Sequence, residues 1–152
     1  MLDAIRNFFE ASAPQEITVT RRLHAVHLAT AVLLVEVARA DDRLGEDEQG
    51  HIIDLLRDHL ELTDAEGEEL VELAHAEANE SVSLQGFTRA IHEHLDDEQK
   101  LSVVELLWRV ALLDGDLHRF EDHLVRKIAE LLYVRNADLI RIRNQVRGQT
   151  PG

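Results

Sequence analysis

Apolar residues recur at helical spacing along most of the chain, and two segments are apolar on every side. The first is centred on residues 31–35, and the second runs over residues 101–113. Helices with no polar face are covered by neighbours all round. The pattern therefore predicts an all-α fold in which the helices ending near Ala40 and Leu113 pack against each other at the centre.

Shorter amphipathic segments surround these two. Residues 2–9 carry one apolar stripe (Leu2, Ile5, Phe8 and Phe9) that ends before Pro14. Thr63 and Glu66 have the spacing of a capping box, in which each residue bonds the other's backbone amide, and Asp96 or Asp97 can cap the second central helix. In total we expect about seven to eight helices.

Residues 33–48 and 106–121 repeat the same pattern 73 residues apart. Six apolar positions coincide, and so do Asp41 with Asp114 and Glu48 with Glu121. After the turns the register continues with one residue lost, so that Leu60 pairs with Leu132. A helical unit copied in this way buries its apolar face against the other copy. We expect a pseudo-two-fold bundle.

This organisation divides the chain into two parts. Residues 1–14 form a short amphipathic helix, and residues 17–148 form one domain of two repeats, about 20–78 and about 97–147. A chain of 152 residues is long enough to bury a single core without disulfides, and it contains no cysteine.

Each repeat has an acidic turn after its central helix, and a structural role explains the turns well. Gly115 tolerates a left-handed conformation at the helix end, Leu117 can enter the core, and the acids lie at the start of the next helix. In the first turn Asp42 occupies the position of this glycine, and a left-handed conformation costs more free energy for aspartate than for glycine.

The turns also predict a divalent metal site, and the sequence leaves both interpretations open. Calcium and magnesium prefer carboxylate oxygens. The candidate ligands are Asp41, Asp42 and Glu48 in the first turn and Asp114, Asp116 and Glu121 in the second. An EF-hand is excluded, because the position that needs a bidentate glutamate holds Val125 in the second turn. Three carboxylates per turn predict weak binding.

The second turn reads Ala111-x-x-Asp114-Gly115-x-Leu117-x-x-x-Glu121. Doubled across a helical bundle, this motif resembles the TerB tellurite-resistance family and the related N-terminal domain of the DjlA co-chaperones. The resemblance extends to residues 33–48, 87–89 and 123–126. It implies the TerB fold, an acidic metal site and a link to tellurite and stress response, with no enzymatic activity. Asp42 departs from the motif, so the second turn is the better metal candidate.

Charge is concentrated in one segment. The chain has a net charge of −14, and residues 41–80 hold 15 acidic and 2 basic residues. Such a surface repels nucleic acid. A cation or a basic patch on an unidentified protein partner suits it better, and assembly of the chain into a homo-oligomer stays open.

No segment of the sequence has the features expected of a membrane-spanning or membrane-binding helix. The most apolar run, residues 25–38, contains His27, Thr30 and Glu36 and is shorter than the roughly 20 apolar residues of a membrane span. The N-terminus lacks a basic region typical of a signal peptide. Membrane contact through residues 1–10 is not expected, because the stripe lacks a lysine-rich polar face. We expect a soluble, cytoplasmic protein.

A metal-dependent enzyme is the alternative, using the carboxylates with His118 or His123. The spacings Glu48-x-x-His51 and Glu72-x-x-His75 also occur in di-iron bundles, where Glu36 and Glu105 would have to supply the remaining carboxylates. No phosphate-binding loop or nucleophile motif is present. We therefore favour a non-enzymatic interaction module.

Overall fold

A computed structural model describes residues 17–40, 46–80, 84–113 and 119–149. These residues form seven α-helices and no strand, which confirms the predicted all-α fold. The helices are α2 (Ile17–Arg39), α3 (Glu46–Leu60), α4 (Asp64–Glu80), α5 (Gln85–His94), α6 (Asp97–Ala111), α7 (Arg119–Leu131) and α8 (Asn136–Gln149).

Helix α2 lies at the centre of the bundle. Every residue from 28 to 35 is buried, and the one polar member, Thr30, donates its hydroxyl proton to the carbonyl oxygen of Val26 at 2.8 Å. Five helices contact α2, namely α3, α4, α5, α6 and α7. The two helices that the sequence shows as apolar on all sides are α2 and α6. Their contact confirms the prediction that they meet in the core.

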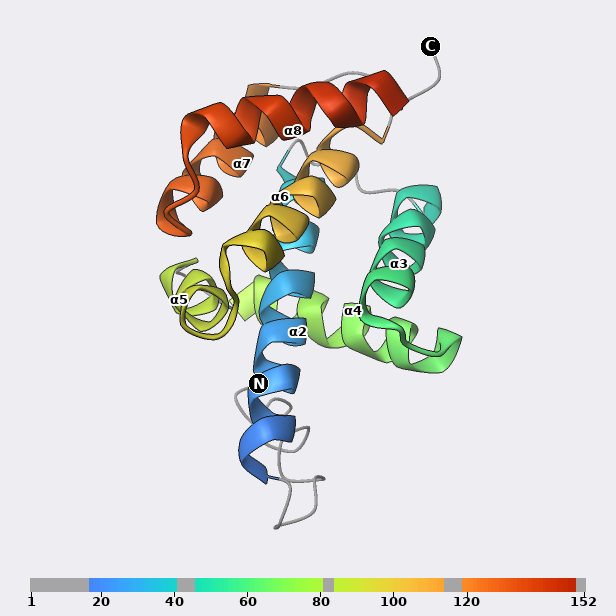
Figure 1. The fold of residues 1–152 in the computed structure, drawn as a ribbon. Helices are drawn as coiled ribbons and strands as arrows, with labels where there is room; N and C mark the ends of the chain where they lie inside the picture. The colour runs from blue at the N-terminus through green and yellow to red at the C-terminus, as the bar shows by residue number, and fades with distance from the viewer. Residues whose placement is uncertain (1–16, 41–45, 81–83, 114–118, 150–152) are drawn as a thin grey trace.

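Helix α6 carries the largest buried side chain, Trp108, and links the centre to α8. The indole Nε1 of Trp108 donates a hydrogen bond to the carbonyl oxygen of Leu139 in α8 at 3.1 Å. In Figure 1, α8 crosses the end of the molecule towards which α2 and α6 both run, with α3 and α4 on one side and α5 and α7 on the other. Both central helices therefore end on the same side of the bundle.

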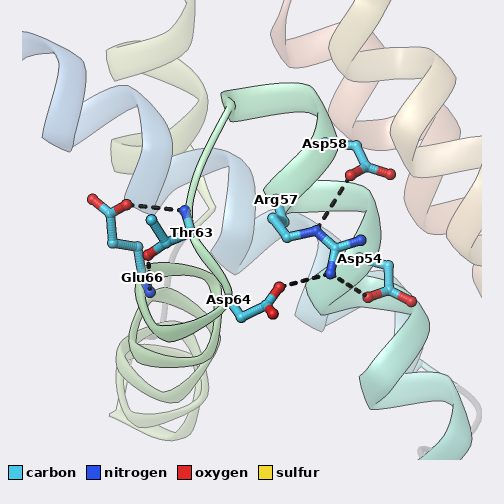
Figure 2. Close-up of polar contacts among 6 residues, drawn as sticks. All are labelled: Asp54, Arg57, Asp58, Thr63, Asp64 and Glu66. Atoms are coloured by element: carbon cyan, nitrogen blue, oxygen red, sulfur yellow. Dashed lines mark hydrogen bonds and ion pairs between the residues drawn. The ribbon is translucent and has the colours of Figure 1, made fainter.

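Two helices begin with reciprocal caps, of which the one at Thr63 was predicted in full and the one at Asp96 only as a single N-cap. The amide of Thr63 donates to Oε1 of Glu66 at 2.9 Å, and the amide of Glu66 donates to Oγ1 of Thr63 at 3.2 Å (Figure 2). At the start of α6, Asp96 and Gln99 exchange equivalent bonds of 2.9 and 2.8 Å. Each cap satisfies amides that have no partner within the helix.

Helices α3 and α7 end in the same way. Glu61 and Tyr133 follow them with left-handed φ angles of 55° and 60°. The amide of Leu62 then bonds the carbonyl of Arg57, and the amide of Val134 bonds that of Ala129, both at 2.9 Å. This is the Schellman arrangement, and it occurs at positions that the predicted register pairs. The division of the chain into two repeats stays a prediction.

The left-handed backbone at the end of α3 yields a stability prediction. Glu61 is exposed and pays the cost of a side chain in this conformation, which glycine avoids. Glu61→Gly should stabilise the protein by about 1 kcal/mol and raise Tm by about 2–4 °C in thermal unfolding. Glu69→Gly, at an exposed position within α4, should destabilise it by a similar amount. A lower Tm for Glu61→Gly would contradict the assignment.

Candidate functional site

The predicted metal ligands divide between described and undescribed residues. Asp41, Asp42, Asp114 and Asp116 lie outside the described residues, so their role as ligands stays a prediction. Glu48 and Glu121 are described, and each is the third residue of the helix after its turn, α3 or α7. A carboxylate in the first turn is favoured by the positive end of the helix dipole.

The two flanking glutamates differ in burial. Glu48 is half-buried, whereas Glu121 is 6% exposed and, with Lys100, is one of two buried charged side chains in the described part of the chain. Both glutamates have interaction partners. Because burying a carboxylate is costly unless it is well compensated, its burial directly after the second turn marks this helix start as specialised.

Asp122, the neighbour of Glu121, leaves an acceptor unused. Its Oδ2 accepts a hydrogen bond from Nε of Arg126 at 2.9 Å, but its Oδ1 is buried and has no hydrogen-bond partner. A buried acceptor without a partner costs about 1–3 kcal/mol. Comparing the repeats missed Asp122, because the paired residue in the first copy is Gln49. The available signal was a second acid in the first turn of α7.

A different group of polar side chains lies at the end of α2, before the first turn. Burial raises the pKa of Glu36, and Arg39 opposes that rise. Burial also lowers the pKa of His75 on α4, and the positive charge of Arg39 lowers it further. One guanidinium nitrogen of Arg39 (Nη1) and Nε2 of His75 are buried without hydrogen-bond partners. A cationic guanidinium therefore lies immediately before the first turn.

The second turn has no such cation directly before it. The residue that the register pairs with Arg39 is Leu112, which is apolar and 3% exposed. A positive charge close to a metal site lowers its affinity for a cation, most strongly where water is excluded. The residues directly before the two turns are therefore electrostatically different, and the apolar residue before the second turn suits a cation better.

The other histidine and carboxylate candidates are dispersed. Glu36 lies near Arg39, and Glu105 accepts from Nη2 of Arg109 at 3.4 Å. His51 and His123 are exposed, and His118 lies outside the described residues. Within the described ranges, no three His, Asp or Glu side chains come together in a way that could hold a metal. The di-iron interpretation therefore gains no support from them.

Comparison with known proteins fits this architecture. Residues 27–144 match the family model described as tellurite resistance protein TerB. The chain belongs to the TerB family. The match to TerB includes both acidic turns, residues 27–39 of α2 and all of α6, which confirms the resemblance seen in the second turn. No curated protein and no solved structure matches the chain.

The His75 environment in this TerB domain predicts a loss of stability in acid. Its folded pKa lies below the ordinary value of 6.5, so the unfolded state binds more protons between the two values. Stability should be lost as pH falls through 6.5 towards the folded pKa. In urea unfolding at pH 7.5 and 5.5, His75→Gln should reduce the difference between the two free energies of unfolding.

The exposed His94 offers a matched control on α5. His94→Gln should leave most of the acid-induced loss of stability in place. The prediction fails if both variants change the pH dependence equally, or if His75→Gln leaves it as it is in the wild type.

Proposed function

We propose that this TerB domain is a non-enzymatic interaction module that binds a divalent cation weakly at its second acidic turn. The observation that carries the proposal is the start of α7, where Glu121 is buried and the adjacent Asp122 keeps an unpartnered, buried carboxylate oxygen. A hard cation would give that oxygen a partner.

The chemistry of the proposed site favours calcium or magnesium. Asp114 and Asp116 would contribute carboxylates from the turn, and Glu121 and Asp122 would contribute from α7. Carboxylates crowded at one turn repel each other, and a bound cation relieves that repulsion. Calcium accepts irregular oxygen shells completed by water, so few protein ligands are consistent with weak affinity. The first turn, which follows Arg39 and has Asp42 in place of glycine, should bind less well.

The acidic surface of α3 and α4 supports an interaction role. Arg57 is the only Lys or Arg in residues 46–80, and it contacts three aspartates, Asp54 at 3.2 Å, Asp58 at 3.3 Å and Asp64 at 2.8 Å (Figure 2). These carboxylates remain 60–81% exposed. The surface is suited to a basic patch on a protein partner and unsuited to nucleic acid.

Three further observations bear on membrane association, on tellurite resistance and on the alternative of an enzyme. None of the described helices combines the length and apolar character needed to cross a bilayer. Family membership gives the link to tellurite resistance. The alternative of a metal-dependent enzyme has no specific observation in its favour, since His123 is exposed and no group of three potential metal ligands lies within the described residues.

Cation binding should be visible as stabilisation. An ion at about ten times its Kd stabilises the folded state by about 1.4 kcal/mol, which should raise Tm by about 3–6 °C. Millimolar calcium or magnesium should produce this rise in the wild type. Asp114→Asn combined with Asp116→Asn should abolish it, and Asp122→Asn should reduce it.

Asp41→Asn serves as the matched control for the weaker turn and should reduce the rise in Tm less than the double substitution does. Each variant is compared with its own ion-free Tm, which separates binding from intrinsic stability. If the wild type and the double variant respond identically to the ions, the acids of the second turn have a structural role only.

A further inference from the structure

A pocket with a volume of about 330 Å³ lies between α2, the end of α3 and the start of α6. Four aliphatic side chains form its apolar wall, namely Val26, Leu60, Leu95 and Val103. The remaining lining residues are polar and come from the same three regions. Four of the ten lining residues are aliphatic and six are polar, and a cavity of this size that combines an apolar wall with convergent polar groups can hold a small molecule.

The hydroxyl groups of the pocket are available mainly as acceptors. Thr30 donates its proton to the carbonyl of Val26 at 2.8 Å, and Ser102 donates to the carbonyl of Glu98 at 3.3 Å. Because Thr30 is 1% exposed and Ser102 is half-buried, the Ser102 oxygen is the hydroxyl acceptor that a ligand can reach. Gln99 differs, because its Oε1 accepts from the amide of Asp96 and its NH₂ group remains as a donor.

Glu61 carries the one carboxylate among the residues that line the pocket, which also include His27 and His59. The pocket lies at the negative end of the α3 dipole and at the positive end of the α6 dipole, so its charge comes from the Glu61 carboxylate. No Lys or Arg is among the lining residues. His59 is exposed, but desolvation lowers its pKa by more than Glu105 raises it, which favours the neutral imidazole. A ligand that brings a positive charge and hydrogen-bond donors fits this environment.

We propose that this pocket binds a small organic cation, with a primary ammonium group at Glu61 and a hydrocarbon body against Val26, Leu95 and Val103. An ammonium group supplies three donors, for which the Glu61 carboxylate and the Ser102 hydroxyl oxygen are the acceptors. The apolar body gains by leaving water for the aliphatic wall. This site is separate from the acidic turns, and it goes beyond the proposed binding of a divalent cation.

A set of three probes tests the charge requirement. Phenethylammonium, 2-phenylethanol and 3-phenylpropanoate share an aromatic body and differ in charge. In NMR titrations of the full chain at constant ionic strength, phenethylammonium should give saturable shifts at the lining residues. The alcohol should bind more weakly, and the carboxylate should not bind. Equal affinities for the three probes would overturn the proposal.

Two variants at surface positions separate this pocket from general attraction to an acidic protein. Glu61→Gln should weaken the binding of phenethylammonium about three- to fivefold, or about 0.6–1 kcal/mol, which is the range of a partly screened ion pair. It should leave the affinity for 2-phenylethanol unchanged. Glu69→Gln, on exposed α4 away from the pocket, removes the same charge and should change neither affinity.

Blocking the pocket provides the steric test. Ser102 is half-buried on α6, and Ser102→Phe should fill part of the cavity and abolish saturable binding, while the circular dichroism of the variant reports its folding. If Glu69→Gln weakens phenethylammonium as much as Glu61→Gln does, or a folded Ser102→Phe binds normally, the cation is held elsewhere and the proposal is wrong.

Discussion

The burial of α2 on all sides is the constraint on which the rest of this structure depends. A helix that is apolar all round is stable in water only if other helices cover every face. Here five helices contact α2, and α6, itself largely apolar, is fixed to α8 through the indole of Trp108. Because α2 and α6 run towards the same end of the bundle (Figure 1), the residues that flank both acidic turns are brought to that end.

Electrostatics then distinguishes the flanks of the two turns. Arg39 precedes the first turn, whereas buried Leu112 precedes the second. After the second turn, α7 begins with a buried glutamate and an aspartate whose Oδ1 has no partner. A pattern of acids that is nearly equal in sequence is therefore flanked by different described residues in its two copies. Only the second combines carboxylates at a helix start with an apolar residue in place of a guanidinium.

Local signals were enough to predict the helical fold and its centre. Apolar periodicity identified α2 and α6, and the spacing of Thr63 and Glu66 identified a capping box, because these patterns depend on residues within one or two turns. Asp122 was missed because burial of its Oδ1 depends on tertiary packing. The pocket between α2, α3 and α6 was missed for the same reason, since its lining residues are up to 77 positions apart. The ligand role of the turn residues stays a prediction.

The central claim is that the second acidic turn, and not the first, is the principal cation site. A calcium titration followed by amide NMR tests it directly, because residues 119–122 and 46–49 at the starts of α7 and α3 report on the two turns separately. The account predicts saturable shifts at residues 119–122 at lower calcium concentration than at residues 46–49. Shifts that saturate together at both helix starts, or first at residues 46–49, would contradict it.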